Sequence, residues 1–207
     1  KHERVVFATA KTIGRRAAQE TLAHFREAGY SGSALSLTAK DSICLSPGRA
    51  CHGEDCPYAR GYYDKLPAAL EAALAAPALD RETLESLAGQ FEVCPYELAQ
   101  DMLPWMDVVI ADLNYVYSLH ASLAGTGETD AQRTTILLDE AHNLPERARG
   151  MYSGHLHKAL VMRARRAAGG ELKRRLERIN RCLLALQRQP WLESQWHSET
   201  RLPEPLM

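Results

Sequence analysis

The chain has 207 residues, of which 45% are hydrophobic and 25% charged. Its mean hydropathy is -0.33, and these values exclude fibrous, collagen-like and wholly disordered classes and allow one or two globular domains. No segment approaches the roughly 20 uncharged apolar residues of a membrane span, so we expect neither a signal peptide nor an anchor. Because the chain begins with Lys1 and enters a strand-like run almost at once, we expect it to be a piece of a longer protein.

The net charge of -1 hides a segregation of charge along the chain. Between Arg147 and Arg188 there are twelve lysines and arginines, opposed only by Glu171 and Glu177. This basic part is a separate electrostatic unit. A basic segment of this kind is either a nucleic-acid surface or a solvated helix face.

The first forty residues have the pattern of a strand, a loop, a helix and a second strand. An apolar run at 5–9 ends in a polar, turn-like loop, and residues 15–28 have helical periodicity followed by Gly29 at a C-cap position. Ala18, Leu22 and Phe25 are expected to share the buried face of that helix. Apolar and polar residues then alternate over 35–39, as in a strand.

The next part changes character and then returns to the first pattern. Residues 41–94 read as an insertion with a helical piece at 66–76, and residues 95–103 as a helix that begins with Pro95. The remaining predicted elements are a buried strand at 107–112, a helix at 114–123, a polar loop at 125–132 and a strand at 135–138. Strands that alternate with helices predict an α/β fold with a parallel sheet.

After Pro145 the pattern is helical. A helix is expected at 156–168, and Gly169-Gly170 separates it from a longer basic amphipathic helix, so a helical hairpin is predicted. The apolar seam of the longer helix consists of Leu172, Leu176, Ile179, Leu183 and Leu186, at heptad-like spacing. The last nineteen residues, rich in proline, predict little regular structure. The predicted divisions are therefore 1–40, 41–106, 107–145 and 146–207.

The strongest chemical signal is Ile136-Leu137-Leu138-Asp139-Glu140-Ala141-His142. An apolar strand that ends in two carboxylates places them where α/β sheets bind ligands. In nucleotide hydrolysis the first carboxylate, Asp139, holds Mg²⁺ through water, and the second, Glu140, orients or deprotonates the attacking water. His142 would sense the terminal phosphate. The alternative is an exposed acidic pair at a strand end.

Cysteine spacing is the second signal. The chain has five cysteines, and Cys44, Cys51, Cys56 and Cys94 fit a soft metal site, either tetrahedral zinc or an iron–sulfur cluster. Only the middle two are close in sequence, and Cys-Pro steps occur at two of the four, which favours a cluster. His52 is an outside candidate ligand. The fifth, Cys182, lies on the apolar seam and reads as a core residue.

Two further groups of residues have a pattern typical of nucleic-acid binding. Thr9-Ala10-Lys11-Thr12, with Arg15 and Arg16 beyond, offers hydroxyls, a lysine and a helix N-terminus to a phosphodiester backbone, although it also fits a plain helix start. The aromatic and basic side chains after Cys56 either stack on unpaired bases or pack over the metal site. They are Tyr58, Arg60, Tyr62 and Tyr63.

The sequence contains no G-x-x-x-x-G-K-[ST] phosphate loop. The chain by itself is therefore not expected to hydrolyse ATP. An alternative reading of the whole chain is a non-enzymatic zinc-binding module for nucleic acid or protein, in which the acidic pair is incidental. A nuclease with a nearby cluster is weaker, because no Asp…Glu-x-Lys pattern supports it.

Taken together, the motifs resemble those of iron–sulfur superfamily 2 DNA helicases of the xeroderma pigmentosum group D type, including the bacterial DinG-like helicases. The resemblance covers residues 5–145 and rests on motifs in family order. They are Thr9-Ala-Lys-Thr, Leu37-Thr-Ala-Lys-Asp-Ser-Ile-Cys44, the four cysteines, Cys94-Pro-Tyr-Glu-Leu-Ala, Asp107-Val-Val-Ile-Ala-Asp-Leu-Asn-Tyr-Val and Leu138-Asp-Glu-Ala-His-Asn-Leu.

The resemblance implies a partial RecA-like motor domain with a mostly helical [4Fe-4S] insertion and the start of a helical arch. It implies that Asp139 and Glu140 serve Mg²⁺ and ATP, that His142 couples hydrolysis to movement, and that the Thr9, Lys11 and Thr12 loop holds single-stranded DNA. It also implies 5′ to 3′ translocation, action at DNA junctions, a role in DNA repair, and a bacterial cytoplasmic protein associated with the nucleoid when bound to DNA. The cluster is expected to stabilise an insertion too small to bury a core of its own. The chain departs from the family in lacking the phosphate loop, the remaining motifs and the second motor domain, and in its tighter spacing of the first three cysteines.

Overall fold

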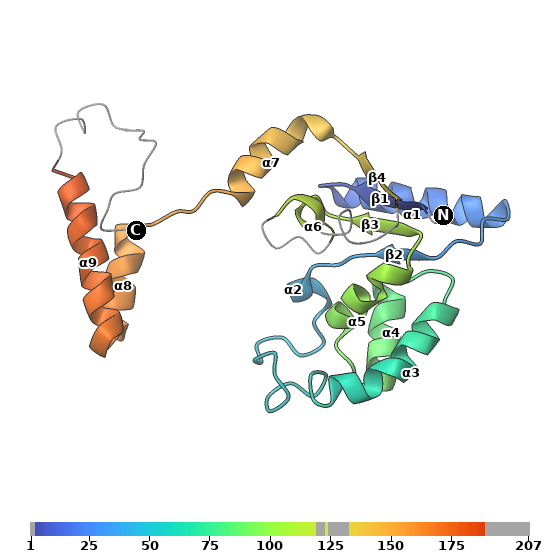
Figure 1. The fold of residues 1–207 in the computed structure, drawn as a ribbon, viewed down its shortest axis with the longest axis horizontal. Helices are drawn as coiled ribbons and strands as arrows, with labels where there is room; N and C mark the ends of the chain where they lie inside the picture. The colour runs from blue at the N-terminus through green and yellow to red at the C-terminus, as the bar shows by residue number, and fades with distance from the viewer. Residues whose placement is uncertain (1–2, 119–122, 124–132, 189–207) are drawn as a thin grey trace. The chain divides into compact units, whose positions relative to one another are not determined.

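The computed structural model describes residues 3–118, 123 and 133–188, and the chain divides into two compact units between Tyr152 and Ser153. The first unit contains a parallel sheet with helices, as predicted, and the second contains a pair of helices (Figure 1). Among the described residues, no helix is both long and apolar enough to cross a membrane.

The sheet of the first unit has four parallel strands in the order β2-β3-β1-β4. The strands are β1 Glu3–Ala8, β2 Ala34–Ser36, β3 Val108–Ala111 and β4 Arg133–Leu138. Val6 of β1 pairs with Val109 on one side and Ile136 on the other. Because β1 is central, its Val6 and Ala8 are fully buried. β4 pairs only with β1 among the described strands, and its Ile136 is 41% exposed.

Helices lie between and after the strands. They are α1 Thr12–Glu27, α2 Lys40–Ile43, α3 Tyr62–Ala75, α4 Arg81–Phe91, α5 Pro95–Met102, α6 Asn114–Tyr117 and α7 Leu144–Met151, with short 3-10 turns η1 Leu103–Trp105 and η2 Ala141–Asn143. Neither α2 nor α4 was predicted from the sequence. On α1, Leu22 is buried but Phe25 is 58% exposed, so the predicted apolar face of that helix is only partly covered. Gly29 takes φ +98° after α1, as a glycine at a helix C-terminus can.

Two predicted elements are markedly shorter in the structure. The helix expected at 114–123 ends at Tyr117, and the strand expected at 35–39 ends at Ser36. The polar loop at 125–132 and the last nineteen residues lie outside the described part of the chain. Helix α4 was not predicted, although Asp80 caps it by accepting a hydrogen bond from the Thr83 N–H at 2.9 Å.

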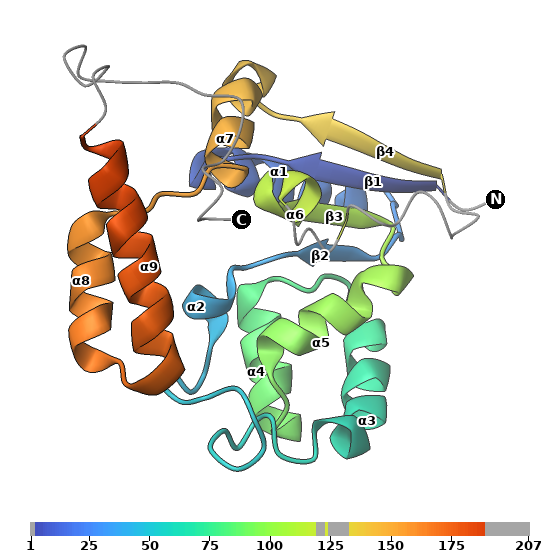
Figure 2. The ribbon, with the colours of Figure 1, turned by 60° about the vertical axis from the view of Figure 1, so that its left-hand side comes forward.

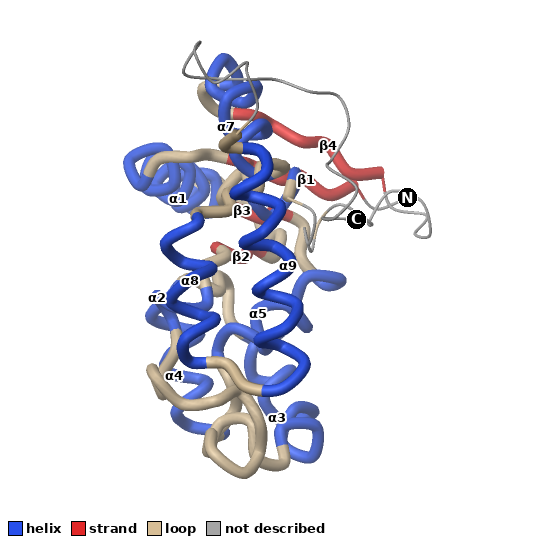
Figure 3. Tube along the Cα trace, turned by 90° about the vertical axis from the view of Figure 1, so that its left-hand side faces the viewer, coloured by secondary structure: helices blue, strands red, loops and turns tan. Residues whose placement is uncertain are grey.

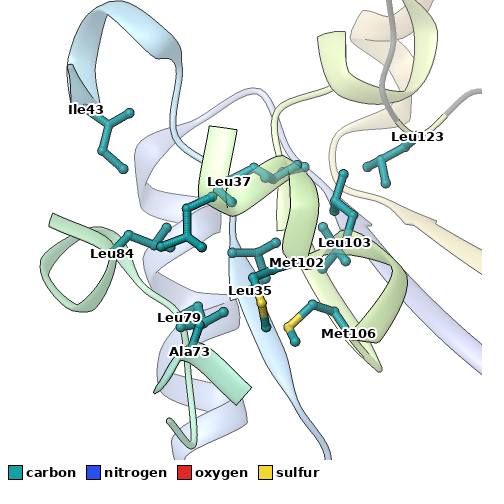
Figure 4. Packing of buried hydrophobic residues seen from close by; sticks show 14 of the residues in the cluster. Leu35, Leu37, Ile43, Ala73, Leu79, Leu84, Met102, Leu103, Met106 and Leu123 are labelled. Atoms are coloured by element: carbon teal, nitrogen blue, oxygen red, sulfur yellow. The ribbon is translucent and has the colours of Figure 1, made fainter. Parts of the chain in front are cut away.

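The cysteine insertion shares the apolar core of the sheet, in agreement with the expectation that it is too small to bury a core of its own. Figures 1 and 2 show α3, α4 and α5 packed together beside β2. Leu79, between α3 and α4, exchanges backbone hydrogen bonds with β2: its N–H donates to Ala34 O at 2.8 Å and its carbonyl accepts from Ser36 N at 2.9 Å. Figure 4 shows insertion side chains, including Leu84 and Met102, gathered around Leu35 and Leu37 of the β2 segment.

The second unit contains two helices, α8 Lys158–Ala167 and α9 Gly170–Leu186, which pack against each other (Figure 3). Gly170 separates them with φ +55°. Val161 and Cys182 are buried between them, so the interpretation of Cys182 as a core residue is confirmed. Leu172, the first member of the predicted seam, is 59% exposed, because it lies in the first turn of α9.

Helix α7 belongs to the first unit, so the division falls later than residue 145. Arg147 of α7 pairs with Asp112 after β3, with Nη1 3.4 Å from Oδ1. This contact joins the segment after the acidic pair to the carboxyl edge of the sheet.

Candidate functional site

The residues predicted for phosphate chemistry meet at the carboxyl edge of the sheet, where β1 and β4 end side by side. The Asp139 N–H donates to Ala8 O at 3.0 Å, which continues the strand pairing by one residue. Thr9 follows β1 directly, is 1% exposed, and donates its hydroxyl hydrogen bond to Asp139 Oδ2 at 2.9 Å. The first residue of the predicted DNA loop therefore contacts the first residue of the predicted Mg²⁺ pair.

Glu140 is held in an uncommon backbone conformation. Its φ of 50° and ψ of 47° lie in the left-handed region, which a non-glycine residue occupies only when neighbouring contacts stabilise it. Lys11 Nζ lies 2.5 Å from its Oε1, and Asn143 Nδ2 donates to its Oε2 at 3.0 Å. The hydrogen bond from Lys11 is the main reason that the pKa of Glu140 lies below its usual range.

His142 lies on the exposed turn η2, in the same short segment as Asn143. It is near enough to help lower the pKa of Glu140 electrostatically. Asp139 and Glu140, both half-buried, and the exposed His142 thus lie together at the end of β4.

Gly14 is a residue that the sequence reasoning missed. A Cβ at this position would lie 2.4 Å from Asp139 Oδ2 and 2.5 Å from Thr9 Oγ1. Only glycine therefore lets the first turn of α1 approach the Thr9–Asp139 hydrogen bond so closely. The signal in the sequence was a glycine inside an otherwise helical pattern.

A polar pocket of about 720 Å³ opens beside the same edge, between α1 and the segments that follow β2 and β3. Three cationic side chains line it, from Arg15, Lys40 and Arg81. Within the described part of the chain, Arg15 Nε is buried and has no hydrogen-bond partner. A buried donor of this kind is costly unless a ligand or water satisfies it. Thr12, at the start of α1, is exposed.

The four cysteines of the predicted metal site all line a second pocket, of about 380 Å³. Cys44 follows α2 and Cys94 precedes α5, while Cys51 and Cys56 come from the loop between α2 and α3. None of these four cysteines forms a disulfide bond. Within the described residues, no three His, Cys, Asp or Glu side chains gather closely enough to hold a single metal ion.

Opposing effects act on the pKa of the Cys94 thiol. Burial raises its pKa, while backbone N–H groups of Glu97 and Tyr96 and the charge of Lys40 lower it. Lys40 pairs with Glu97 at 3.3 Å and lies 5.2 Å from the centre of the Tyr96 ring. The N-terminus of α5 thus offers donors that stabilise a thiolate.

The aromatic and basic residues after Cys56 divide into two groups. Tyr62 is buried and donates to Asp101 Oδ2 at 2.8 Å, and burial raises the pKa of its hydroxyl. Arg60 donates to the carbonyls of Gly53 and Glu54, which holds the cysteine loop. Tyr63 is 82% exposed, so its ring, unlike that of Tyr62, is open to a ligand. The stacking prediction for Tyr62 is corrected, because its ring packs within the core instead.

The motif order and this geometry agree with the comparison to known families. A family model described as DEAD_2 matches residues 32–161, from β2 through the four cysteines and the acidic pair to the start of α8. The chain belongs to the DEAD_2 family. Within this DEAD_2 chain, the matched region contains both Asp139-Glu140 and all four cysteines of the second pocket.

This DEAD_2 chain spans about a tenth of the length of the relatives that it matches. It is 29% identical over 144 residues to a Fanconi anemia group J protein homolog of Gallus gallus and 24% identical over 146 residues to Regulator of telomere elongation helicase 1 of Homo sapiens. Each match covers 60% of this chain but 11% of the relative. The ATP-dependent DNA helicase CHL1 of Saccharomyces cerevisiae (strain YJM789) is 32% identical over 77 residues, which are 37% of this chain and 9% of that protein.

Solved structures support the fold. A structure titled Truncated XPD aligns with a TM-score of 0.56 over 87% of this chain and 54% of that one, at 20% identity. A second, titled XPD_Helicase, aligns with a TM-score of 0.52 over 85% of this chain and 32% of that one, at 18% identity. The DEAD_2 chain therefore has a partial XPD-type fold with a RecA-like parallel sheet.

Proposed function

We propose that this chain is part of the first motor domain of an ATP-dependent 5′ to 3′ DNA helicase with a [4Fe-4S] cluster. In that helicase the chain would bind single-stranded DNA, help to separate duplex DNA at junctions, and supply the acidic residues of the ATPase site. The proposal places it in the bacterial cytoplasm, on the nucleoid when DNA is bound.

The observation that carries the proposal is the direct contact between the two predicted sites. Thr9 and Lys11 of the predicted DNA loop bind Asp139 and Glu140 of the predicted ATPase pair, across two neighbouring strands. A motor that converts hydrolysis into movement on DNA must couple its nucleotide and DNA sites, and direct contact between them provides such coupling. An incidental acidic pair at a strand end would not need it.

At the acidic pair, Asp139 has the position and chemistry of a Mg²⁺ residue. Its carboxylate lies at the end of a strand, and Thr9 fixes one of its oxygens. Oxygen ligands at such an edge suit Mg²⁺, which would bind mainly through water. Mg²⁺ with ATP would supply the reactive phosphate in the complete protein. Glu140 is the second carboxylate, oriented by Asn143, and His142 is exposed beside it.

The DNA surface in this proposal runs from the Thr9–Thr12 loop along the 720 Å³ pocket. Arg15 presents an unsatisfied buried donor among the described residues, and Lys40 and Arg81 add positive charge. Phosphate oxygens satisfy such donors. Tyr63, on the insertion, has the exposed ring that base stacking requires.

The cysteine pocket fits an iron–sulfur cluster by its donor set. Four thiols from three separate segments line one cavity, whereas the described side chains do not converge as a single ion requires. A cluster is larger than one ion and accepts thiolates that arrive from different segments. When bound, it would tie the loop between α2 and α3 to the start of α5.

Two measurements on the purified chain test the proposal. Elemental analysis of protein purified in the absence of oxygen should find about four irons and four sulfides per chain, and the protein should be brown. Binding of a fluorescent oligodeoxythymidine should weaken steeply as salt rises, because backbone contacts release counterions. The chain alone should not hydrolyse ATP, since it has no G-x-x-x-x-G-K-[ST] loop. One zinc without iron, or DNA affinity unaffected by salt, would favour the zinc-binding module instead.

A further inference from the structure

The ion pair between Lys11 and Glu140 joins two groups that have separate tasks in the proposed function. Lys11 belongs to the loop expected to hold DNA, and Glu140 to the pair expected to serve hydrolysis. Their side chains are accessible, with exposed fractions of 57% and 33%, while the Thr9–Asp139 contact beside them is sheltered, with Thr9 1% exposed. One contact is therefore open to exchange with a ligand and the other is not.

We propose that single-stranded DNA displaces Lys11 from Glu140. Lys11 is then a positioning residue, through which DNA binding changes the environment of the acidic pair. Without DNA, its ammonium group is held by the carboxylate. With DNA, the same ammonium group binds a backbone phosphate and Glu140 Oε1 becomes free. This inference rests on the proposed function, because it deepens the regulation of that same site.

The exchange is favourable on electrostatic grounds. Exposed lysine–carboxylate pairs contribute little net stability, so a phosphate can compete for the cation. Until the exchange occurs, Glu140 neutralises the Lys11 ammonium group, which lowers the affinity of the loop for DNA. Binding DNA and pairing with Glu140 are therefore competing uses of Lys11.

Glu140 stays ordered when Lys11 leaves. Asn143 still donates to its other oxygen, Oε2, at 3.0 Å, and the backbone remains in the left-handed turn before η2. The exchange therefore frees one oxygen of an oriented carboxylate, rather than releasing the whole side chain. Asp139 keeps its contact with Thr9 in both states.

The test measures DNA affinity of the 207-residue chain, with neither ATP nor Mg²⁺, by anisotropy of a fluorescent oligodeoxythymidine. Glu140→Gln removes the competing charge and should tighten binding about two- to fivefold at low salt, the range expected for an exposed pair. Glu140→Gly, which suits the left-handed backbone, should do the same. Glu146→Gln is the matched control, since it removes an exposed charge from α7 nearby and should have a smaller effect.

A double-mutant cycle isolates the contact. Lys11→Ala should weaken binding, and Glu140→Gln should add nothing in the Lys11→Ala background. Equal gains from Glu140→Gln and Glu146→Gln would overturn the inference, as would a Glu140→Gln gain that persists without Lys11, because both indicate a general charge effect. A wild-type chain that binds no DNA would overturn the proposed function itself. A wild-type chain that binds DNA in a salt-dependent way, but is unchanged by Glu140→Gln, would overturn the exchange alone.

Discussion

Gly14→Ala is the substitution that most directly tests how the site is built. Its added methyl group would lie 2.4 Å from Asp139 Oδ2 and 2.5 Å from Thr9 Oγ1, well inside van der Waals contact. Relieving the clash costs the charge-assisted hydrogen bond, about 1.5–3 kcal/mol, or an overpacking penalty of about 1–3 kcal/mol. The usual gain from replacing a helical glycine by alanine, roughly 0.5–1 kcal/mol, offsets only part of this. We expect the free energy of unfolding to fall by about 1–2 kcal/mol, together with weaker single-stranded DNA binding.

The assay is urea unfolding monitored by circular dichroism, with Gly89→Ala as the matched control. Gly89 also lies in a helix, α4, but a Cβ there would meet nothing within 4 Å. That variant should gain roughly 0.5–1 kcal/mol from the reduced entropy of the unfolded chain. If Gly14→Ala is as stable as wild type, or gains stability as Gly89→Ala does, the close approach of α1 to the Thr9–Asp139 contact is not a feature of the folded protein.

Three further predictions concern the insertion and the pocket. The Cys94→Ser variant should lose iron, and its residues 45–61 should become sensitive to proteolysis. Its helix content should stay the same, because the insertion helices share the apolar core, and a loss of helical signal would contradict this. Tyr63→Ala should weaken DNA binding by about 1 kcal/mol or more, whereas Tyr62→Phe should leave it unchanged and reduce stability by about 1 kcal/mol; the reverse pattern would restore Tyr62 as the stacking residue. Burial raises the pKa of Tyr115 to about 12, so the free energy of unfolding should fall as the pH rises from the unfolded pKa near 10 to 12. Tyr115→Phe should lose less stability over this range, and an equal loss would show that another group titrates.

Local sequence patterns carried most of the element assignment and the chemistry of the acidic pair. The apolar run before Asp139 predicted a strand of the kind found at the centre of parallel sheets. β4 is parallel and runs from Arg133 to Leu138, but among the described strands it lies at the edge, and its Ile136 is 41% exposed. The Pro95 start predicted α5 to within one residue at its end. These features depend on periodicity and on single-residue backbone preferences, which the sequence displays directly. The membership in the DEAD_2 family followed from motifs in order, which is also a property of the sequence.

Other features depended on which distant segments meet. Helix α4 is not one of these features: Asp80 was a recognisable cap, and Leu84, Leu87, Ala88 and Phe91 follow helical spacing, so the sequence displayed a helix that was not predicted. The shared core of sheet and insertion, by contrast, arises from Leu79 pairing with β2, a contact across more than forty residues. The sequence predicted only an insertion too small to bury a core of its own, and the contact with β2 shows which core it joins.

What the sequence by itself determined is the set of chemical groups: two carboxylates after one strand, a threonine and lysine loop after another, and four thiols in an insertion. Only the tertiary structure decided their partners. The parallel order β1-β4 brings Thr9 to Asp139 and Lys11 to Glu140, across about 130 residues of chain, because strands that pair in parallel end at the same edge. The need for glycine at position 14 could be explained only from the tertiary structure, because a Cβ there would clash with side chains that the fold brings together.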